Sequence, residues 1–203
     1  MKIILFDFDG VIADSFSSAF EVNKLMCPHV TEDDYRCAFE GNINDWEMPV
    51  HTDECRKDID FFGEYVPKMK NVKIFDGMQE VIKSLSHGYK LIVISSTITS
   101  PIKEFMERHQ VAQYFTEIMG NDVHASKVEK IKMVFSKYGT DSKQCIFITD
   151  TLGDMKEASH VGVVAVGVTW GFQNKETLLE GKPLLIVQKP KELLSAISSY
   201  FHG

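Results

Sequence analysis

Short apolar runs alternate along the chain with longer segments of mixed polarity. Five such runs are continuous rather than alternating: Ile3–Phe6, Leu91–Ile94, Cys145–Ile148, Val163–Val168 and Leu184–Val187. Continuous apolar runs of this length are typical of strands that are covered on both faces. We therefore predict a buried, mainly parallel sheet built from these runs.

The segments between the runs carry helix start and stop signals. One predicted helix begins at Asp76-Gly77 and ends near His87-Gly88. A second is capped by Thr99 or Ser100 before Pro101. A third begins with a capping box of Ser126 and Glu129 and ends at Gly139. Helices that alternate with buried strands predict an α/β fold.

Residues 16–73 depart from this alternation. The segment has helical periodicity, with Thr31 and Thr52 as predicted N-caps before acidic first turns, and "EGNINDWEMP" (40–49) as a loop. We predict a helical domain, 16–73, inserted after the first strand into an α/β core formed by 1–15 and 74–203. The chain passes between the two near Asp14–Phe16 and Val72–Asp76, where we expect a hinge that lets the insert rock over a site.

Composition narrows the class of protein. The 203 residues are 44% hydrophobic and 25% charged, which is typical of a soluble globular chain. A net charge of −7 argues against a nucleic-acid partner, and no apolar stretch is long enough to span a membrane. The four cysteines form no C-x-x-C pair, so we expect reduced thiols in a cytoplasmic protein that lacks a signal peptide.

Polar residues follow the ends of three predicted strands. They are Asp7 and Asp9 after the first, Ser95 and Ser96 after "KLIVI", and Asp150 and then Asp154 after "CIFIT". Because parallel strands end along one edge of a sheet, these residues are expected to converge there. Lys127, in the first turn after Ser126, can reach the same edge.

The chemistry of this set points to phosphate. Crowded carboxylates repel one another, and a hard divalent cation such as Mg²⁺ relieves that repulsion. The lysine and the hydroxyls suit an anionic phosphoryl group. A carboxylate can attack phosphorus to form an aspartyl phosphate, and a second one two residues on can exchange a proton with the leaving group.

Four motifs in order, "DFDGV", "VISST", "SKVEK" and "FITDTLGD", resemble those of the haloacid dehalogenase superfamily of phosphohydrolases. The resemblance covers nearly the whole chain. It implies a Rossmann-like, three-layer core with a parallel sheet. The position of the insert is similar to that of the small helical cap (the C1 class) of phosphoglycolate-phosphatase-like enzymes and sugar phosphomutases.

The resemblance also implies a role for each residue of the set. Asp7 would be the nucleophile, Asp9 the general acid and base, Ser95 and the backbone of Ser96 phosphate ligands, and Lys127 the neutralising cation. Mg²⁺ would be bound by Asp7, the main-chain carbonyl of Asp9 and Asp150, with Asp154 in an outer position that orients Lys127 or a metal-bound water. Val128 stands where the family commonly has proline.

Several alternatives stay open at this point. Asp9 favours a phosphate ester over a dehalogenation, and "NINDWE", which has no Lys or Arg, favours a phosphatase over a sugar phosphomutase. Arg36, Arg56 or Lys57 could still provide the second phosphate site that a mutase needs. A receiver-type signalling domain fits less well, because its acceptor aspartate lies on a later strand.

We therefore expect a Mg²⁺-dependent phosphoric monoester hydrolase that acts on a small-molecule phosphate ester, as a monomer or a homodimer. Trp46 is expected either to line a substrate pocket or to pack in the core of the insert.

Overall fold

The computed structural model describes residues 1–46, 54–56 and 58–203 of the chain. Its centre is a six-stranded sheet in the order β5-β4-β1-β6-β7-β8, in which every neighbouring pair is parallel. The strands are β1 (Ile3–Phe6), β4 (Lys90–Ile94), β5 (Phe115–Met119), β6 (Cys145–Thr149), β7 (Val164–Val168) and β8 (Leu185–Val187). The predicted α/β fold and all five predicted strands are confirmed.

β5 is the strand that the apolar pattern did not predict. Its sequence, Phe-Thr-Glu-Ile-Met, alternates in polarity, and it pairs with β4 alone at the edge of the sheet. Glu117 in its middle accepts hydrogen bonds from Lys137 and Tyr138. Of the five residues of β5 only Met119 is buried, so this strand lacks the continuous apolar run of the inner strands.

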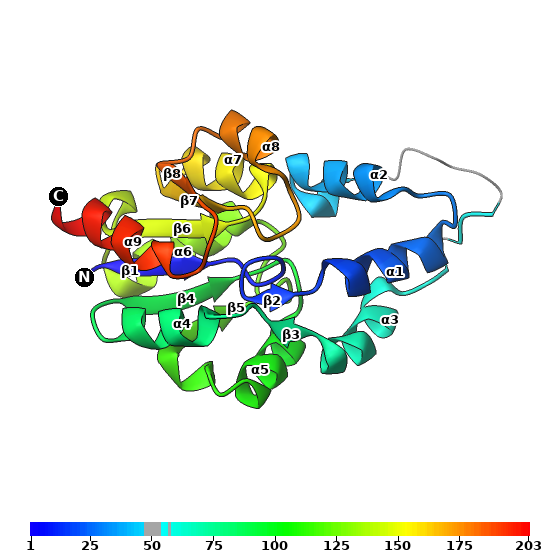
Figure 1. The fold of residues 1–203 in the computed structure, drawn as a ribbon, viewed down its shortest axis with the longest axis horizontal. Helices are drawn as coiled ribbons and strands as arrows, with labels where there is room; N and C mark the ends of the chain where they lie inside the picture. Colours follow the sequence, from blue (N-terminus) through cyan, green and yellow to red (C-terminus); the bar gives the residue numbers. More distant parts are fainter. Residues whose placement is uncertain (47–53, 57) are drawn as a thin grey trace.

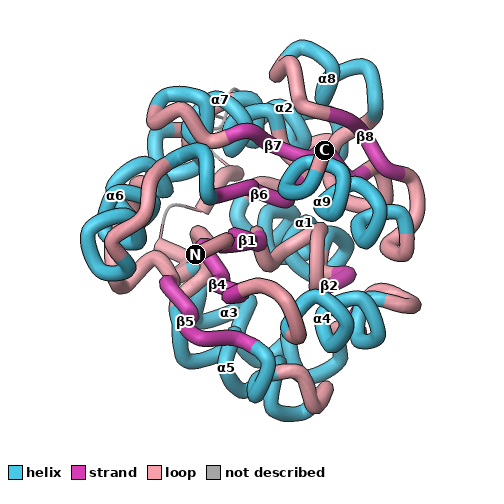
Figure 2. Tube along the Cα trace, turned by 90° about the vertical axis from the view of Figure 1, so that its left-hand side faces the viewer, coloured by secondary structure: helices cyan, strands magenta, loops and turns pink. Residues whose placement is uncertain are grey.

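Helices cover both faces of the sheet (Figure 2). Ile4 and Phe6 of β1 pack in one core cluster with α4 (Met78–Ser86), α5 (Thr99–Arg108) and α9 (Glu192–His202). Ile3 and Leu5 pack in a second cluster with α6 (Lys127–Tyr138) and α7 (Leu152–His160). Side chains of a strand alternate between faces, so one apolar run supplies both cores. The remaining helix of the α/β part, α8 (Lys175–Glu180), packs through Leu178 against Met155 and Ala165.

The predicted helix signals are mostly confirmed, with two differences. Ser126 caps α6 by accepting from the Glu129 N–H, and Gly139 ends it in the left-handed region at φ 58°. The Ser126 N–H, however, donates to Nδ1 of His124, so the capping box lacks its second bond. Helix α5 already begins at Thr99, whose hydroxyl donates to Asp122 rather than capping the helix.

The segment after β1 is helical and extends beyond the carboxyl ends of the strands (Figure 1). It contains α1 (Phe16–Met26), α2 (Glu32–Cys37), η1 (Ala38–Glu40), η2 (Ile43–Asp45), α3 (Phe61–Lys68) and η3 (Met69–Asn71). Two further 3-10 turns, η4 (Ala112–Tyr114) and η5 (Ser142–Gln144), belong to the α/β part.

The ends of the helical segment are tied together by a ribbon that the sequence did not predict. Strand β2 (Ala13–Asp14) pairs antiparallel with β3 (Lys73–Ile74), so the two chain crossings lie side by side. Thr31 caps α2 in a full capping box with Asp34, as predicted. The predicted cap Thr52 and the end of the predicted loop, 47–49, lie outside the described residues.

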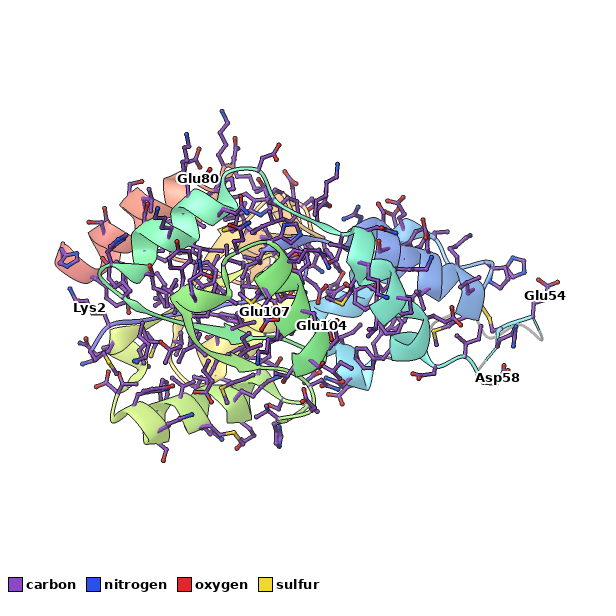
Figure 3. The ribbon with its side chains drawn as sticks, turned by 90° about the horizontal axis from the view of Figure 1, so that it is seen from below. Lys2, Glu54, Asp58, Glu80, Glu104 and Glu107 are labelled. Atoms are coloured by element: carbon purple, nitrogen blue, oxygen red, sulfur yellow. A yellow bond between two sulfur atoms is a disulfide. The ribbon has the colours of Figure 1, made fainter. Side chains whose placement is uncertain are left out.

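The expectation of reduced cysteines is wrong for two of the four. Cys27, at the end of α1, forms a disulfide with Cys55, and their Cα atoms lie 4.3 Å apart. Figure 3 places the neighbouring Glu54 and Asp58 at the tip of the helical segment, at the opposite end of the molecule from Lys2. A pairing across 28 residues has no local spacing signal, and its presence removes one argument for a cytoplasmic location. Cys37 and Cys145 are free thiols.

In the ranges that the structure describes, no helix is long and apolar enough to cross a membrane.

Candidate active site

The strand ends converge as predicted, and a tight turn after β1 makes room for them. The Asp7 N–H donates to the carbonyl of Ile148, which extends the β1–β6 pairing to the edge of the sheet. Gly10 turns the chain at φ 74°, and a Cβ atom there would lie 2.0 Å from Oδ2 of Asp150. Only glycine therefore lets the turn lie directly against the Asp150 carboxylate.

Lys127 joins two buried carboxylates. Its Nζ lies 2.9 Å from Oδ1 of Asp7 and 2.6 Å from Oδ2 of Asp154, and all three residues are at most 7% exposed. Asp154 also accepts a hydrogen bond from the Thr149 hydroxyl, and Asp7 Oδ1 one from the Phe8 N–H. The Asp154 carboxylate thus holds the Lys127 ammonium beside Asp7.

Burial and charge act in opposite directions on this group. Burial raises the pKa of Asp7 well above its ordinary value, and the opposing charge of Lys127 does not cancel that effect. Burial would also raise the pKa of Asp154, but the charge and hydrogen bonds of Lys127 bring it below its ordinary value. The pKa of Lys127 is raised by the two acids despite its burial, so this lysine stays a cation.

Asp9 has a different environment from Asp7, two residues away. Its Oδ1 accepts hydrogen bonds from the hydroxyls of Ser15 and Tyr65, at 2.7 and 2.5 Å, and its Oδ2 from that of Thr97, at 2.7 Å. Tyr65 belongs to α3, so the helical segment directly contacts this carboxylate. Hydroxyl groups can donate or accept, so they suit a carboxyl group that gains and loses a proton.

The serines after β4 lie where they were predicted, and a second lysine supports them. Ser95 is 1% exposed, its Oγ accepts from the Thr97 N–H, and its carbonyl accepts from Nζ of Lys130 at 2.6 Å. Ser96 is half-buried, and both serines line the same cavity as Asp7. Lys130 lies one helical turn after Lys127 and is completely buried.

Asp150 has the properties expected of a metal ligand. Its Oδ2 accepts from the Phe172 N–H at 2.6 Å, whereas its Oδ1 is buried without a hydrogen-bond partner. Burial raises the pKa of Asp150 to about 7. An unpaired buried carboxylate oxygen is costly, and a hard cation would satisfy it.

Only two of the four predicted carboxylates at this site are available to bind a metal. Among the described residues, no three acidic, histidine or cysteine side chains are grouped so as to hold a metal ion. The Asp9 carboxylate accepts hydrogen bonds from three hydroxyls, and the Asp154 carboxylate accepts them from Lys127 and Thr149. The carboxylates of Asp7 and Asp150, with the main-chain carbonyl of Asp9, are the donors that fit Mg²⁺, which usually keeps several water ligands.

A cavity of about 360 Å³ opens from these residues toward the helical segment. Its walls include Asp7, Asp9, Ser95, Ser96, Lys127 and Asp154 from the α/β part and Asn23, Tyr35, Phe39, Trp46, Phe61 and Phe62 from the helical segment. Trp46 therefore lines a pocket, which was one of its two expected roles. Trp170 instead donates to the carbonyl of Val11 and does not line this cavity.

The structure adds five residues to those that the motifs predicted: Tyr65, Thr97, Lys130, Thr149 and Glu157. Glu157 accepts from the Lys127 N–H and lines the cavity. Thr97, Lys130 and Thr149 lie within the quoted motifs, so the motifs could have indicated them. Tyr65 has no sequence signal, because only folding brings α3 to the end of β1.

The sequence model of the haloacid dehalogenase-like hydrolases matches residues 4–168, a range that contains every site residue that the motifs predicted, from Asp7 to Asp154. The chain belongs to this family. A phosphoglycolate phosphatase of Synechococcus elongatus is 22% identical over 98% of both chains. A probable phosphatase, IndB, of Dickeya dadantii is 27% identical over 96% of this chain and 92% of its own.

Solved structures share the fold. A haloacid dehalogenase-like hydrolase from Streptococcus pneumoniae superimposes with a TM-score of 0.83 at 22% identity, over 97% of this chain and 98% of its own. A predicted phosphatase from Clostridium acetobutylicum superimposes with a TM-score of 0.78 at 24% identity, over 98% of both chains. The predicted family, the class of enzyme and the helical insert after β1 are thus confirmed.

Proposed function

We propose that this protein is a Mg²⁺-dependent phosphatase that hydrolyses a small phosphate monoester through a phosphorylated Asp7. The observation that carries the proposal is the Lys127 ammonium 2.9 Å from Asp7, in a cavity shared with Ser95. This arrangement offers a carboxylate nucleophile and phosphate ligands at one place.

The first step transfers the phosphoryl group to the protein. A carboxylate oxygen of Asp7 forms a bond to phosphorus as the bond from phosphorus to the ester oxygen breaks, and Asp9 gives its proton to that oxygen. Lys127 and the Ser95 hydroxyl hold the phosphoryl oxygens, and Asp154 keeps Lys127 in place. The alcohol leaves through the open side of the cavity.

The second step restores Asp7. Asp9, now a carboxylate, takes a proton from a water molecule whose oxygen bonds to phosphorus as the bond from phosphorus to Asp7 breaks. Inorganic phosphate leaves, and Asp9 is again protonated. Its three hydroxyl partners fix the orientation of the carboxyl group in both steps.

The metal would be held by the carboxylates of Asp7 and Asp150 and by the Asp9 carbonyl, and it would neutralise charge that develops on the phosphoryl group. Asp150 is the strongest argument for a metal at this place, because its buried Oδ1 has no hydrogen-bond partner. The side chains of Asp154 and Asp9 would not bind the metal, because each already accepts hydrogen bonds from other side chains.

Simple hydrolysis is favoured over a phosphomutase reaction. Among the described residues, Lys127 is the sole cation in the cavity wall. Arg36 donates to the carbonyl of Phe172 and pairs with Glu32, and Arg56 pairs with Asp58. Neither arginine offers a second phosphate site, and Lys57 lies outside the described residues.

We also propose that 16–73 is a cap domain that rocks over the core of 1–15 and 74–203. The β2–β3 ribbon lies at the two crossings, and Tyr65 links α3 to Asp9. Opening of the cap would break that hydrogen bond and admit substrate.

The test is a panel of phosphate monoesters assayed for released phosphate with Mg²⁺ and with EDTA. We expect Mg²⁺-dependent release that Asp7→Asn abolishes. Metal-independent turnover, or unchanged activity in Asp7→Asn, would overturn the proposal, and isomerisation of a sugar phosphate without phosphate release would establish a mutase.

A further inference from the structure

Aromatic rings form a large part of the wall of the cavity beside Asp7. Seven aromatic residues contribute to its wall: Tyr35, Phe39, Trp46, Phe61, Phe62, Tyr65 and Phe172. Phe39, Trp46, Phe61 and Phe62 are only half-buried, so parts of their rings remain available to a ligand. Exposed rings around a pocket are typical of sites that bind a flat apolar group.

Six of the rings form two groups that both begin at the catalytic residues. In the first group, Tyr65 donates to Asp9, Phe61 stacks on Tyr65 at 5.3 Å, and Phe62 lies 5.5 Å from Phe61. This group comes from α3.

In the second group, the N–H of Phe172 donates to Asp150, and its ring contacts that of Phe39 edge to face at 5.0 Å. Phe39 in turn contacts Tyr35 at 5.1 Å. Figure 1 shows α2, which carries Tyr35, and α3 on either side of α1. The leaving group of a phosphate bound at Asp7 would therefore lie between aromatic walls.

The charges of the cavity disfavour a leaving group that carries a second negative charge. Its acidic lining consists of Asp7, Asp9, Asp154 and Glu157. Lys127, the one cation in the wall among the described residues, already pairs with Asp7 and Asp154. A carboxylate on the leaving group would lose water and find no free cation in this part of the wall.

We infer that the preferred substrate is a phosphate monoester whose alcohol part is an uncharged, planar aromatic group. The inference rests on the proposed phosphatase function and names the substrate class for it. It separates this chain from relatives that are named for phosphoglycolate, whose leaving group carries a carboxylate.

The test compares esters that differ in one property. Benzyl phosphate, 4-carboxybenzyl phosphate, cyclohexylmethyl phosphate and 2-phosphoglycolate are all esters of primary alcohols. The second adds one negative charge to the ring, and the third replaces the flat ring by a puckered one of similar size. We expect kcat/KM for benzyl phosphate to exceed that for each of the other three by about tenfold or more.

Two variants test whether the wall of the cavity causes the preference for an aromatic substrate. Trp46→Leu should lower kcat/KM for benzyl phosphate severalfold more than kcat/KM for acetyl phosphate, which has no ring. Phe201→Leu is the matched control, because Phe201 stacks on Tyr89 outside the cavity wall. It should leave both substrates unaffected, and circular dichroism would show that both variants fold.

The outcomes separate the two proposals. Equal or faster hydrolysis of 2-phosphoglycolate or 4-carboxybenzyl phosphate, or no selective effect of Trp46→Leu, would overturn the aromatic preference while leaving the phosphatase intact. No phosphate release from any of these esters in the presence of Mg²⁺ would overturn the phosphatase itself.

Discussion

Replacing Asp150 by asparagine should stabilise the metal-free protein. Asp150 is completely buried, and its Oδ1 has no hydrogen-bond partner. Burial raises its pKa from 3.8 to about 7, so the folded protein binds this proton more tightly than the unfolded chain. The free energy of unfolding therefore falls as the pH rises from about 4 to about 7, and asparagine, which stays neutral, escapes that loss.

The size of the difference in the free energy of unfolding follows from the pKa shift of Asp150. Each pH unit between the two pKa values corresponds to about 1.4 kcal/mol. Asp150→Asn should therefore be more stable than the wild type by about 4 kcal/mol at pH 8 and by about 2 kcal/mol at pH 5, without metal. The side-chain oxygen of asparagine can still accept the N–H of Phe172, so the local structure is kept.

Urea unfolding in EDTA at the two pH values measures the difference. Asp76→Asn, at an exposed position, is the matched control and should stay within about 0.5 kcal/mol of the wild type. Added Mg²⁺ should then raise the stability of the wild type but not that of Asp150→Asn. A difference between wild type and Asp150→Asn that does not change with pH, or equal stabilisation of both by Mg²⁺, would refute the reasoning.

Three further predictions concern residues to which the motifs assigned no role. Tyr65→Phe removes one of the hydrogen bonds to Asp9 and should lower kcat about tenfold with little change in KM; steady-state kinetics with an unchanged kcat would contradict the role of this tyrosine. Burial, followed by the charge of a neighbouring lysine, lowers the pKa of Lys130 to about 8, so its protonated form opposes folding. Between pH 8 and pH 10 the wild type should gain about 2 kcal/mol relative to Lys130→Met in urea unfolding, whereas a constant difference would count against a depressed pKa. Thiol titration of the unfolded, unreduced protein should find two reactive cysteines, and four would disprove the Cys27–Cys55 disulfide.

The sequence predicted the α/β part well because its strands are buried on both faces. A strand such as β6 (Cys145–Thr149) contains a continuous apolar run, Cys145–Ile148, and the acid that follows the strand marks its carboxyl end. The edge strand β5 was missed for the opposite reason, since Glu117 interrupts its apolar pattern where solvent is near. Asp7 and Asp150 converge because they follow the neighbouring parallel strands β1 and β6, and Lys127 joins them from the first turn of α6.

The contacts of the helical segment were not predictable in the same way. Tyr65 reaches Asp9 only because α3 folds back across the end of β1, and the disulfide joins residues that no spacing rule connects. The aromatic cavity likewise depends on how α2 and α3 pack around α1. Sequence periodicity indicates that a residue belongs to a helix, but not which other helix or strand it meets in the fold.

The central claim is that Asp7 carries the phosphoryl group during turnover. The most direct measurement is mass spectrometry of the protein after a single turnover of benzyl phosphate with Mg²⁺, stopped with acid. The account predicts that the protein gains the mass of one phosphoryl group, located on the peptide that contains Asp7. Phosphate release with no phosphorylated protein, or a phosphoryl group on any other residue, would contradict it.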